Sequence, residues 1–399
     1  MSAVLMLAHR IPLPPNKGDR IRSFHWLQAL RRRYDVYVGT FTDAPEDRVH
    51  EAELNRQCAG CYVGHLRPWS RRVLSLTALL KGEALTIAYY RHGGLGRWVA
   101  ELMRAKRIEK IFVFSSSMAQ FATATAGPRR VVDFCDVDSD KWAQYATRHR
   151  WPLSWIYKRE ARELGAAERR LAEEFDASLF VSDNEARLFR RLVPGVDAKV
   201  FAVANGVDSQ YFDPAPDRPR PFAATGPAIV FTGAMDYWAN VDAVSWFAAE
   251  VLPAVREQVP QATFHIVGSR PSAAVGRLAS LPGVFVTGTV PDVRPYVHHA
   301  HAVVAPLRVA RGVQNKVLEA MAMAKPVVAT RAAVAGLDGQ LPASLGVSDS
   351  ATGVAAAVID LVRQAVPRTA PDNREFVLKH YGWQRNLDRF LAIIDGGAS

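Results

Sequence analysis

The sequence predicts an α/β protein made of two doubly wound, Rossmann-like domains that face each other across a cleft, and three observations lead to this prediction. Short runs rich in Val, Ile and Phe alternate with longer amphipathic stretches, which is typical of βα units in parallel sheets. At 399 residues the chain is longer than a single hydrophobic core usually supports. The alternation also restarts near residue 205, and the segment Phe212–Pro227 that follows holds five prolines.

The first half is expected to supply one sheet, and we assign residues 1–205 to this domain. Its apolar runs predict strands over Ala3–Ala8, Asp35–Thr40, Lys110–Phe114, Val131–Phe134 and Ala177–Val181. Helical patterns lie between them at Arg20–Arg33, Gly96–Lys106 and Leu153–Phe175.

The second domain is assigned to residues 206–373. The predicted strands are Ala228–Thr232, Thr263–Val267, Val284–Thr287, Ala302–Ala305 and Pro326–Ala329, and the predicted helices are Val241–Gln258, Val293–His299 and Val313–Ala324. A last helical stretch covers Arg374–Ile394, and residues 374–399 are expected to pack back onto the first domain. Ligands of doubly wound sheets bind outside the carboxyl ends of the strands, which puts the expected site in the cleft.

Composition excludes several classes of protein. Hydrophobic residues make up 49% of the chain and charged residues 22%, which describes a globular protein and not a disordered one. Three cysteines exclude a disulfide scaffold and fit a reducing cytosol, so we expect a cytoplasmic protein. No run of 18 apolar residues predicts a membrane-spanning helix, and the N-terminal MSAVLMLAHRIP is expected to be a strand and no secretory signal.

The net charge of +11 is unevenly distributed. Residues 1–200 carry 33 Lys and Arg against 23 Asp and Glu, whereas residues 201–399 carry 17 against 16. A basic half suggests an anionic partner, such as a lipid phosphate, a nucleic acid or a phosphorylated substrate. A solvated, Arg-rich surface without a partner explains the same composition.

The most informative segment follows the strand that ends at Ala305. A loop containing Gly312 comes next, and a helix is expected to begin near Val313. A helix N-terminus offers unpaired N–H groups and a positive dipole end, which suit a phosphate, and Lys316 in the first turn adds a charge for a diphosphate. Glu319 lies on the same helix face, where its carboxylate suits the two hydroxyls of a ribose. The alternative is a solvated Lys–Glu pair.

Several segments of the chain resemble one family. The stretch KVLEAMAMAKPVVAT, which begins at Lys316, resembles the donor-site helix of retaining glycosyltransferases of family 4, which have the GT-B fold. Three further segments resemble the same group: HRIPLPPNKGDRIRS from His9, VANGVDSQYF from Val203 and FTGAMDYWAN from Phe231. Together with VDFCDVDSDKW from Val132, they are similar to sugar transferases associated with bacterial exopolysaccharide and exosortase (PEP-CTERM) systems. The resemblance covers essentially the whole chain.

The resemblance implies a UDP- or GDP-linked sugar donor bound by the second domain and a glycan or lipid-linked acceptor bound by the first. It also implies transfer with retention of configuration, with no metal ion or other cofactor and no nucleic-acid partner. Lys316 and Glu319 are assigned catalytic roles at the diphosphate and the ribose, and the base is expected against the loop Gly288–Val290. The remaining residues assigned to the donor are Lys17, Gly18, Gly233, Arg270, Thr289, Val290, Arg311, Gly312, Val313, Gln314 and Asn315.

The chain departs from the family at Arg311. The group usually carries two glutamates separated by seven residues, and the second matches Glu319, whereas the first position is Arg311. In the family the first glutamate lies near the hydroxyls of the donor sugar, so recognition of that sugar is expected to be altered or made by backbone groups. Arg311 is expected to neutralise the diphosphate together with Lys316. Loss of activity is the alternative.

The loop Pro14–Asp19 lies between the first predicted strand and its helix. Gly18 lets backbone approach a phosphate closely, and the start of a helix favours anions. The loop is no G-x-G-x-x-G fingerprint, which argues against a dinucleotide dehydrogenase. By resemblance, Lys17 and Gly18 face the donor diphosphate, and a plain βα turn is the alternative.

Asp133, Asp136, Asp138 and Asp140 form the densest acidic cluster of the chain. Four carboxylates suit Mg²⁺ or Mn²⁺, but the βα pattern around them favours the GT-B fold, so no metal site is expected. Related enzymes carry a cleft-facing His in this region, and Asp136 is the nearest polar match, so we assign it a catalytic role by resemblance. Capping of a helix by one of these aspartates is the alternative.

Three other groups have competing interpretations. Cys58, Cys61 and His65 are part of a zinc-ligand pattern, but a second C-x-x-C is missing and zinc is not expected. The histidine-rich turn His298–His301 fits a cap or a surface better than a metal site. Ser115–Met118 ends a strand and either lines the acceptor cleft or caps a helix.

Two basic, Trp-containing stretches of the first half suggest contact with an anionic membrane surface: His65–Lys81 and Trp151–Arg159. A peripheral position at the inner face of the plasma membrane is therefore expected. Ordinary helices with core-facing leucines and solvated arginines are the alternative.

The resemblance implies a hexosyltransferase of exopolysaccharide or cell-surface glycan synthesis. Two alternatives remain: a non-catalytic GT-B partner in a polysaccharide assembly, and a nucleotide-sugar 2-epimerase, which shares the architecture.

Overall fold

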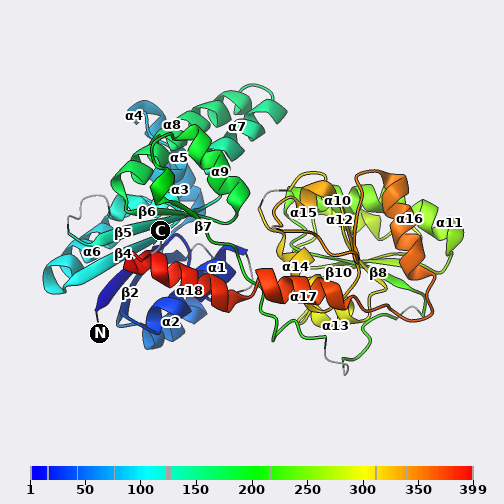
Figure 1. Cartoon of the computed structure of the whole chain (residues 1–399). Helices are drawn as coiled ribbons and strands as arrows, with labels where there is room; N and C mark the ends of the chain where they lie inside the picture. The colour runs from blue at the N-terminus through cyan, green and yellow to red at the C-terminus, as the bar shows by residue number, and fades with distance from the viewer. Residues whose placement is uncertain are drawn as a thin grey trace. The chain divides into compact units, whose positions relative to one another are not determined.

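The computed structural model describes residues 2–15, 18–42, 44–75, 77–122, 127–214, 218–223, 225–310, 312–337 and 339–397. The chain divides into two compact units (Figure 1). The first comprises Met1–Ala204 with Gln384–Ser399, and the second comprises Asn205–Trp383. Of the C-terminal stretch predicted to pack onto the first domain, residues 384–399 belong to the first unit, whereas residues 374–383 belong to the second.

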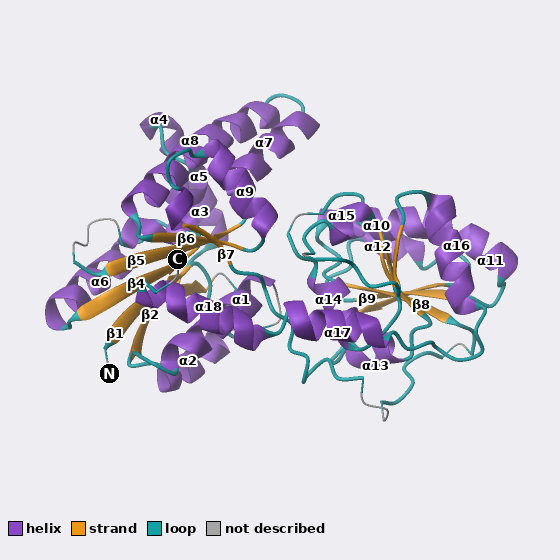
Figure 2. Cartoon of the chain, viewed as in Figure 1, coloured by secondary structure: helices purple, strands orange, loops and turns teal. Residues whose placement is uncertain are grey.

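The first unit is built on a seven-stranded parallel sheet with the order β3-β2-β1-β4-β5-β6-β7 (Figure 2). β1 pairs with β2 on one side and with β4 on the other, so the strand order reverses between β1 and β4. The strands are β1 (Ala3–Ala8), β2 (Asp35–Thr42), β3 (Gly60–His65), β4 (Ile108–Phe114), β5 (Arg129–Cys135), β6 (Ala177–Phe180) and β7 (Val200–Ala202).

Helices cover both faces of this sheet: Figure 1 shows α1, α2 and α18 on one side and α8 and α9 on the other. The helices of the unit are α1 (Gly18–Arg31), α2 (Glu51–Gln57), α3 (Pro68–Ser75), α4 (Ala78–Lys81), α5 (Leu85–Tyr89), α6 (Gly93–Ala105), α7 (Asp138–Arg148), α8 (Leu153–Glu174), α9 (Asp183–Leu192) and α18 (Trp383–Asp395). Short 3₁₀ helices lie at η1 (Pro45–His50), η2 (Ser116–Phe121) and η3 (Asp197–Lys199).

The second unit repeats the design with a six-stranded sheet of order β10-β9-β8-β11-β12-β13, again with parallel pairs. Here the order reverses between β8 and β11. The strands are β8 (Ala228–Thr232), β9 (Thr263–Val267), β10 (Val284–Gly288), β11 (Ala302–Ala305), β12 (Val327–Ala329) and β13 (Leu345–Val347). The helices are α10 (Trp238–Trp246), α11 (Leu252–Gln258), α12 (Ala273–Leu278), α13 (Arg294–His298), α14 (Asn315–Ala322), α15 (Arg331–Val334), α16 (Ala351–Val362) and α17 (Pro371–His380).

The prediction of two doubly wound parallel sheets is confirmed. The central strands β1, β8, β9 and β11 are buried almost throughout, as expected for parallel strands covered on both faces. Strands β3, β7 and β13 were not predicted, because β3 contains two glycines and β7 and β13 have only three residues each. No helix among the described residues is long and apolar enough to cross a membrane.

Most predicted helices differ from the observed ones by a few residues at their ends, and two are divided. The stretch 241–258 is α10 and α11 joined by a π-helical turn at Phe247–Val251 (η4). The helix expected from Val313 begins at Asn315. The final helix is two helices, since α17 ends at His380 and the chain bends before α18.

A buried ion pair connects α1 to the sheet of the first unit. Arg22 Nε donates to Asp133 Oδ2 at 2.7 Å, and Trp26 Nε1 donates to the same oxygen at 2.8 Å. Arg22 Nη1 also donates to the carbonyl of Val203 at 2.7 Å. Each charged side chain is at most 1% exposed, so each ion depends on the other for its stabilisation.

Replacing Asp133 by Ala is therefore expected to lower the free energy of unfolding of the first unit by about 3–5 kcal/mol, because the Arg22 charge remains buried without its partner. Urea titration followed by tryptophan fluorescence measures this. The matched control is Glu83→Ala, which removes the exposed carboxylate paired with Arg91 and should cost less than about 1 kcal/mol. Equal losses in the two variants would contradict the role assigned to the buried pair.

Candidate functional site

Most residues predicted to bind the donor lie on loops that follow four neighbouring strands of the second sheet. Gly233 follows β8, Arg270 follows β9, Thr289 and Val290 follow β10, and Gly312–Glu319 follows β11. Because these strands are parallel, their carboxyl ends meet at one edge of the sheet. The edge includes the reversal of strand order between β8 and β11, where doubly wound sheets bind ligands.

The ammonium group of Lys316 lies at this reversal, because Lys316 follows β11 and its side chain reaches β8. Its Nζ donates to Asn240 Oδ1 at 2.6 Å and lies 4.0 Å from the centroid of the Phe231 ring. A Cβ atom at Gly233 would approach this Nζ to 3.1 Å and Asn240 Nδ2 to 2.8 Å. Lys316 comes from α14, whereas its three neighbours come from β8, the residue after β8 and α10, so residues far apart in sequence surround one cation.

Lys316 and Glu319 are both partly buried and both titrate near neutrality. Burial lowers the pKa of Lys316 to about 7 and raises the pKa of Glu319 to about 7, while the charge of each opposes the shift of the other. Among the described residues, Asn240 is the hydrogen-bond partner of Lys316, and none binds the Glu319 carboxylate. The alternative of a solvated ion pair is therefore wrong: the two groups share a helix face without an ion pair.

The start of α14 carries a second unsatisfied group. Gln314 is the N-cap residue, and its carbonyl accepts from the N–H groups of Val317 and Leu318. Asn315 Oδ1 is buried without a donor from any described residue. Buried acceptors are normally paired, so this oxygen is available to an N–H or O–H group of a ligand. The side chain of Val313 is buried and contributes to the core.

Glycines allow the loops at this edge to approach closely. A Cβ atom at Gly268 would lie 1.7 Å from the carbonyl oxygen of Gly233, and one at Gly336 would lie 2.3 Å from that of Gly312. Gly312 itself has a φ of 59°, in the left-handed region. Asn240 and Gly268 were not predicted from the sequence, although Gly268 directly follows β9 and Asn240 ends the segment FTGAMDYWAN.

Three predicted donor residues lie in the first unit or outside the described part, and Arg270 is already paired. Arg270 is exposed and forms an ion pair with Asp236 at 2.9 Å. Lys17 and Arg311 lie outside the described residues. Gly18 begins α1 and so belongs to the first unit.

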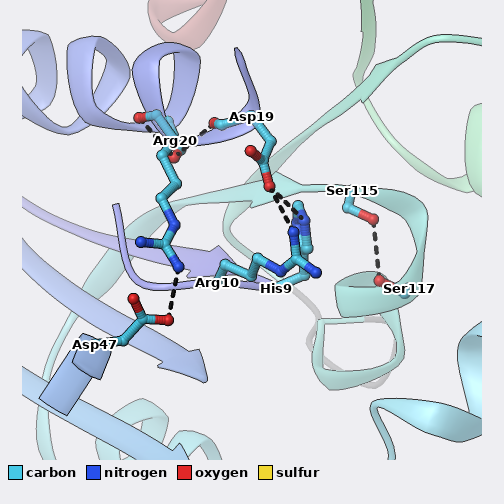
Figure 3. A network of polar contacts seen from close by, with 8 residues as sticks. His9, Arg10, Asp19, Arg20, Asp47, Ser115 and Ser117 are labelled. Atoms are coloured by element: carbon cyan, nitrogen blue, oxygen red, sulfur yellow. Dashed lines mark hydrogen bonds and ion pairs between the residues drawn. The ribbon is translucent and has the colours of Figure 1, made fainter. Parts of the chain in front are cut away.

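The first unit has its own polar cluster at the reversal between β1 and β4 (Figure 3). Asp19, in the first turn of α1, lies 3.5 Å from His9 Nε2 and 3.3 Å from Arg10 Nη1. Burial alone would raise the pKa of Asp19, but the hydrogen bond from His9 and the charges of His9 and Arg10 hold it well below its usual value. Ser115, which follows β4 with a φ of 79°, lies 3.0 Å from Ser117 between the two Oγ atoms.

The acidic cluster does not converge on one point. Asp133 is committed to Arg22, Asp138 pairs with Lys141 at 3.7 Å, and Asp140 accepts from Gln144. Asp136 lies between β5 and α7. The burial of Asp138 raises the pKa of its carboxyl group, and the charge of Asp136 adds to this shift, while Lys141 and His9 oppose it.

Among the described residues, no three His, Cys, Asp or Glu side chains gather as a metal site. Cys61 lies in β3 and donates to the carbonyl of Leu54, whereas His65 contacts Thr42 at 2.8 Å. At the turn before β11, His301 accepts from the N–H of Ala228, and the carbonyl of His298 accepts from Lys325.

Comparison with known proteins shows which kind of domain carries this site. Residues 226–364, which contain Gly233, Lys316 and Glu319, match the family model "Glycosyl transferases group 1". This part of the chain therefore resembles a glycosyltransferase group 1 domain. No curated protein sequence matches the chain.

The likeness to solved structures extends over both units. HepE of Anabaena, in complex with UDP, has a TM-score of 0.69 and 14% identity, covering 99% of this chain and 100% of that chain. Sucrose-phosphate synthase of Thermosynechococcus elongatus has a TM-score of 0.69 and 15% identity, with 99% of each chain covered. WaaG, a glycosyltransferase involved in lipopolysaccharide biosynthesis, has a TM-score of 0.65 and 15% identity, covering 99% of this chain and 100% of that chain. The predicted GT-B fold is confirmed.

The titration of the site predicts a pH dependence. Below pH 7 Lys316 is mainly charged and Glu319 mainly neutral, and above pH 7 the reverse holds. Affinity for inorganic pyrophosphate should therefore fall as the pH rises from about 6 to about 8. Calorimetry on Lys316→Met should show affinity reduced about ten-fold at the lower pH and a weaker pH dependence.

The control is Arg331→Gln, which removes an exposed cation of the same unit. It should retain the affinity and pH dependence of the unmodified protein. Pyrophosphate affinity that rises with pH, or that is unaffected by Lys316→Met, would exclude this lysine from an anion site.

Proposed function

We propose that the protein transfers a hexose from a UDP- or GDP-linked donor to a glycan or lipid-linked acceptor, as a family 4 enzyme that retains the anomeric configuration. The observation that carries the proposal is the Lys316 ammonium at the β8–β11 reversal of a glycosyltransferase group 1 domain. A structural neighbour, HepE, is described in complex with UDP and with UDP-glucose, which supports a nucleotide-sugar donor.

In this proposal the chain's own groups stabilise the departing nucleotide. The bond between the sugar carbon C1 and the diphosphate oxygen breaks, and negative charge develops on that oxygen. Lys316 and the N-terminus of α14 stabilise this charge electrostatically. The acceptor oxygen bonds to C1 on the same face, and its proton passes to the leaving phosphate. No metal ion is required.

Other groups position the two substrates. Glu319 accepts hydrogen bonds from the ribose hydroxyls, Asn315 Oδ1 accepts from a donor group nearby, and the loop carrying Thr289 and Val290 flanks the base. Gly18 and Asp136 belong to the unit assigned to the acceptor, where Asp136 takes the catalytic position that the family resemblance gives it. The same resemblance supports a cytoplasmic location and a role in the exopolysaccharide synthesis of PEP-CTERM systems.

The ribose assignment is tested by comparing two ligands. Glu319→Ala should weaken binding of UDP or GDP by about 1–3 kcal/mol, the cost of losing charge-assisted hydrogen bonds. The same variant should leave binding of inorganic pyrophosphate unchanged or slightly stronger, since pyrophosphate has no ribose and a nearby carboxylate is removed. Calorimetry measures both. Equal weakening for the two ligands would contradict a ribose contact.

The activity is tested by incubating the protein with UDP- and GDP-sugars and with glycan or lipid-linked acceptors, followed by mass spectrometry of the products. A glycosylated acceptor, formed equally in excess EDTA, is expected. Free UDP without a transfer product would indicate an epimerase, and nucleotide binding without turnover would indicate a non-catalytic partner. Activity abolished by EDTA and restored by Mn²⁺ would overturn the metal-independent mechanism.

A further inference from the structure

Helices α7 and α8 form a hairpin whose tip exposes large apolar side chains. The two helices pack along each other, and Figure 1 shows their connection at the end that points away from the sheet of the first unit. Trp151 is 80% exposed, Trp155 54% and Leu153 45%. Exposing three large apolar side chains to water at one tip is unfavourable. Their exposure therefore indicates a surface that binds a membrane or another molecule.

These three side chains are not needed to hold the hairpin together. A separate set of rings lies between the helices: Trp142 and Tyr157 have centroids 5.2 Å apart, and His149 meets Tyr157 edge-on at 5.1 Å. His149 also contacts the carbonyl of Tyr145 at 2.8 Å. The tip is thus fixed from below by other residues, which leaves Trp151, Leu153 and Trp155 free to face outward.

The charge around the tip has one sign. Residues 146–158 contain Arg148, Arg150 and Lys158 and no Asp or Glu. Arg150 precedes the two tryptophans in the sequence and Lys158 follows them, and both side chains are exposed. The first acidic residue beyond them, Glu160, is buried and accepts from the N–H groups of Leu85 and Thr86, so it does not neutralise the tip.

We propose that the α7–α8 tip docks on an anionic lipid bilayer, with Trp151, Leu153 and Trp155 entering the interfacial region and Arg150 and Lys158 contacting lipid phosphates. Tryptophan prefers this region because its ring is apolar and its N–H is polar, and lysine or arginine stems follow apolar surface while their charges reach the headgroups. An acidic protein surface would satisfy the cations but would have to bury two indoles on a convex tip. The inference does not depend on sugar transfer, since vesicle binding requires neither donor nor acceptor.

The second basic stretch, around α3, is a weaker candidate. Trp69 is exposed there, but Arg71 donates to the carbonyl of Arg91 and Arg91 itself pairs with Glu83. Cations held by protein groups are less available to lipid phosphates. We therefore assign membrane docking to the hairpin tip, and a substitution of Trp69 in α3 tests this assignment.

The experiment is co-sedimentation of the full-length chain with vesicles of phosphatidylglycerol and phosphatidylcholine, at low salt and near 0.5 M salt, with phosphatidylcholine vesicles as the neutral reference. The unmodified protein should bind the anionic vesicles, more weakly at high salt. W151S/W155S should bind about ten-fold less at both salt concentrations. R150S/K158S should bind about ten-fold less at low salt and lose the preference for anionic lipid.

The matched controls lie on the second unit. V366S/L378S replaces two exposed apolar side chains and R363S/R368S removes two exposed cations, and both should bind as the unmodified protein does. Circular dichroism and thermal melting establish that each variant is folded. If W151S/W155S does not fold, R150S/K158S still tests the proposal. Absence of vesicle binding, unchanged binding by both hairpin variants, or a loss confined to Trp69→Ser would overturn the proposal.

Discussion

The buried carboxylate of Asp133 is the constraint on which the first unit depends. It lies within β5, and it accepts from Arg22 and Trp26 of α1 and from the N–H of Cys135. A charge removed from water is tolerated only when its partners are in place, so α1 has a single acceptable position on the sheet. The start of α1 is thereby fixed as well, and with it Asp19 and the polar cluster at the reversal between β1 and β4.

The partly buried cation of the second unit, Lys316, is held in a different way. Arg22 has two hydrogen bonds to a carboxylate and one to a carbonyl, whereas Lys316 has one hydrogen bond to a neutral amide and a ring beneath it. Incomplete compensation shifts the pKa values of Lys316 and Glu319 toward neutrality, which is typical of groups that await a ligand. One unit uses a buried charge to fix its structure, and the other keeps a charge available for binding.

Local pattern in the sequence predicts those features whose cause is local. The strands Ala3–Ala8 and Ala228–Thr232 have the predicted bounds because their burial on both faces requires uninterrupted apolar runs. Lys316 was found from its place in the first turn of a helix. The Asn240 that holds it is 76 positions away, and nothing near Asn240 in the sequence specifies that contact. The strand Gly60–His65 was missed for a similar reason, since its pairing with β2 compensates for two glycines that a local pattern reads as a turn.

The position of helix α18 affects the order in which the two units can complete their folding. Its Phe390 stacks on Trp26 at 4.2 Å and meets Phe112 at 4.9 Å, and all three rings are fully buried. These contacts join the last residues of the chain to the first sheet, with the whole second unit inserted between them. During synthesis the face of the first sheet that carries Trp26 therefore stays uncovered until α18 has left the ribosome, after the second unit. A fragment that ends at residue 204 lacks part of its own core.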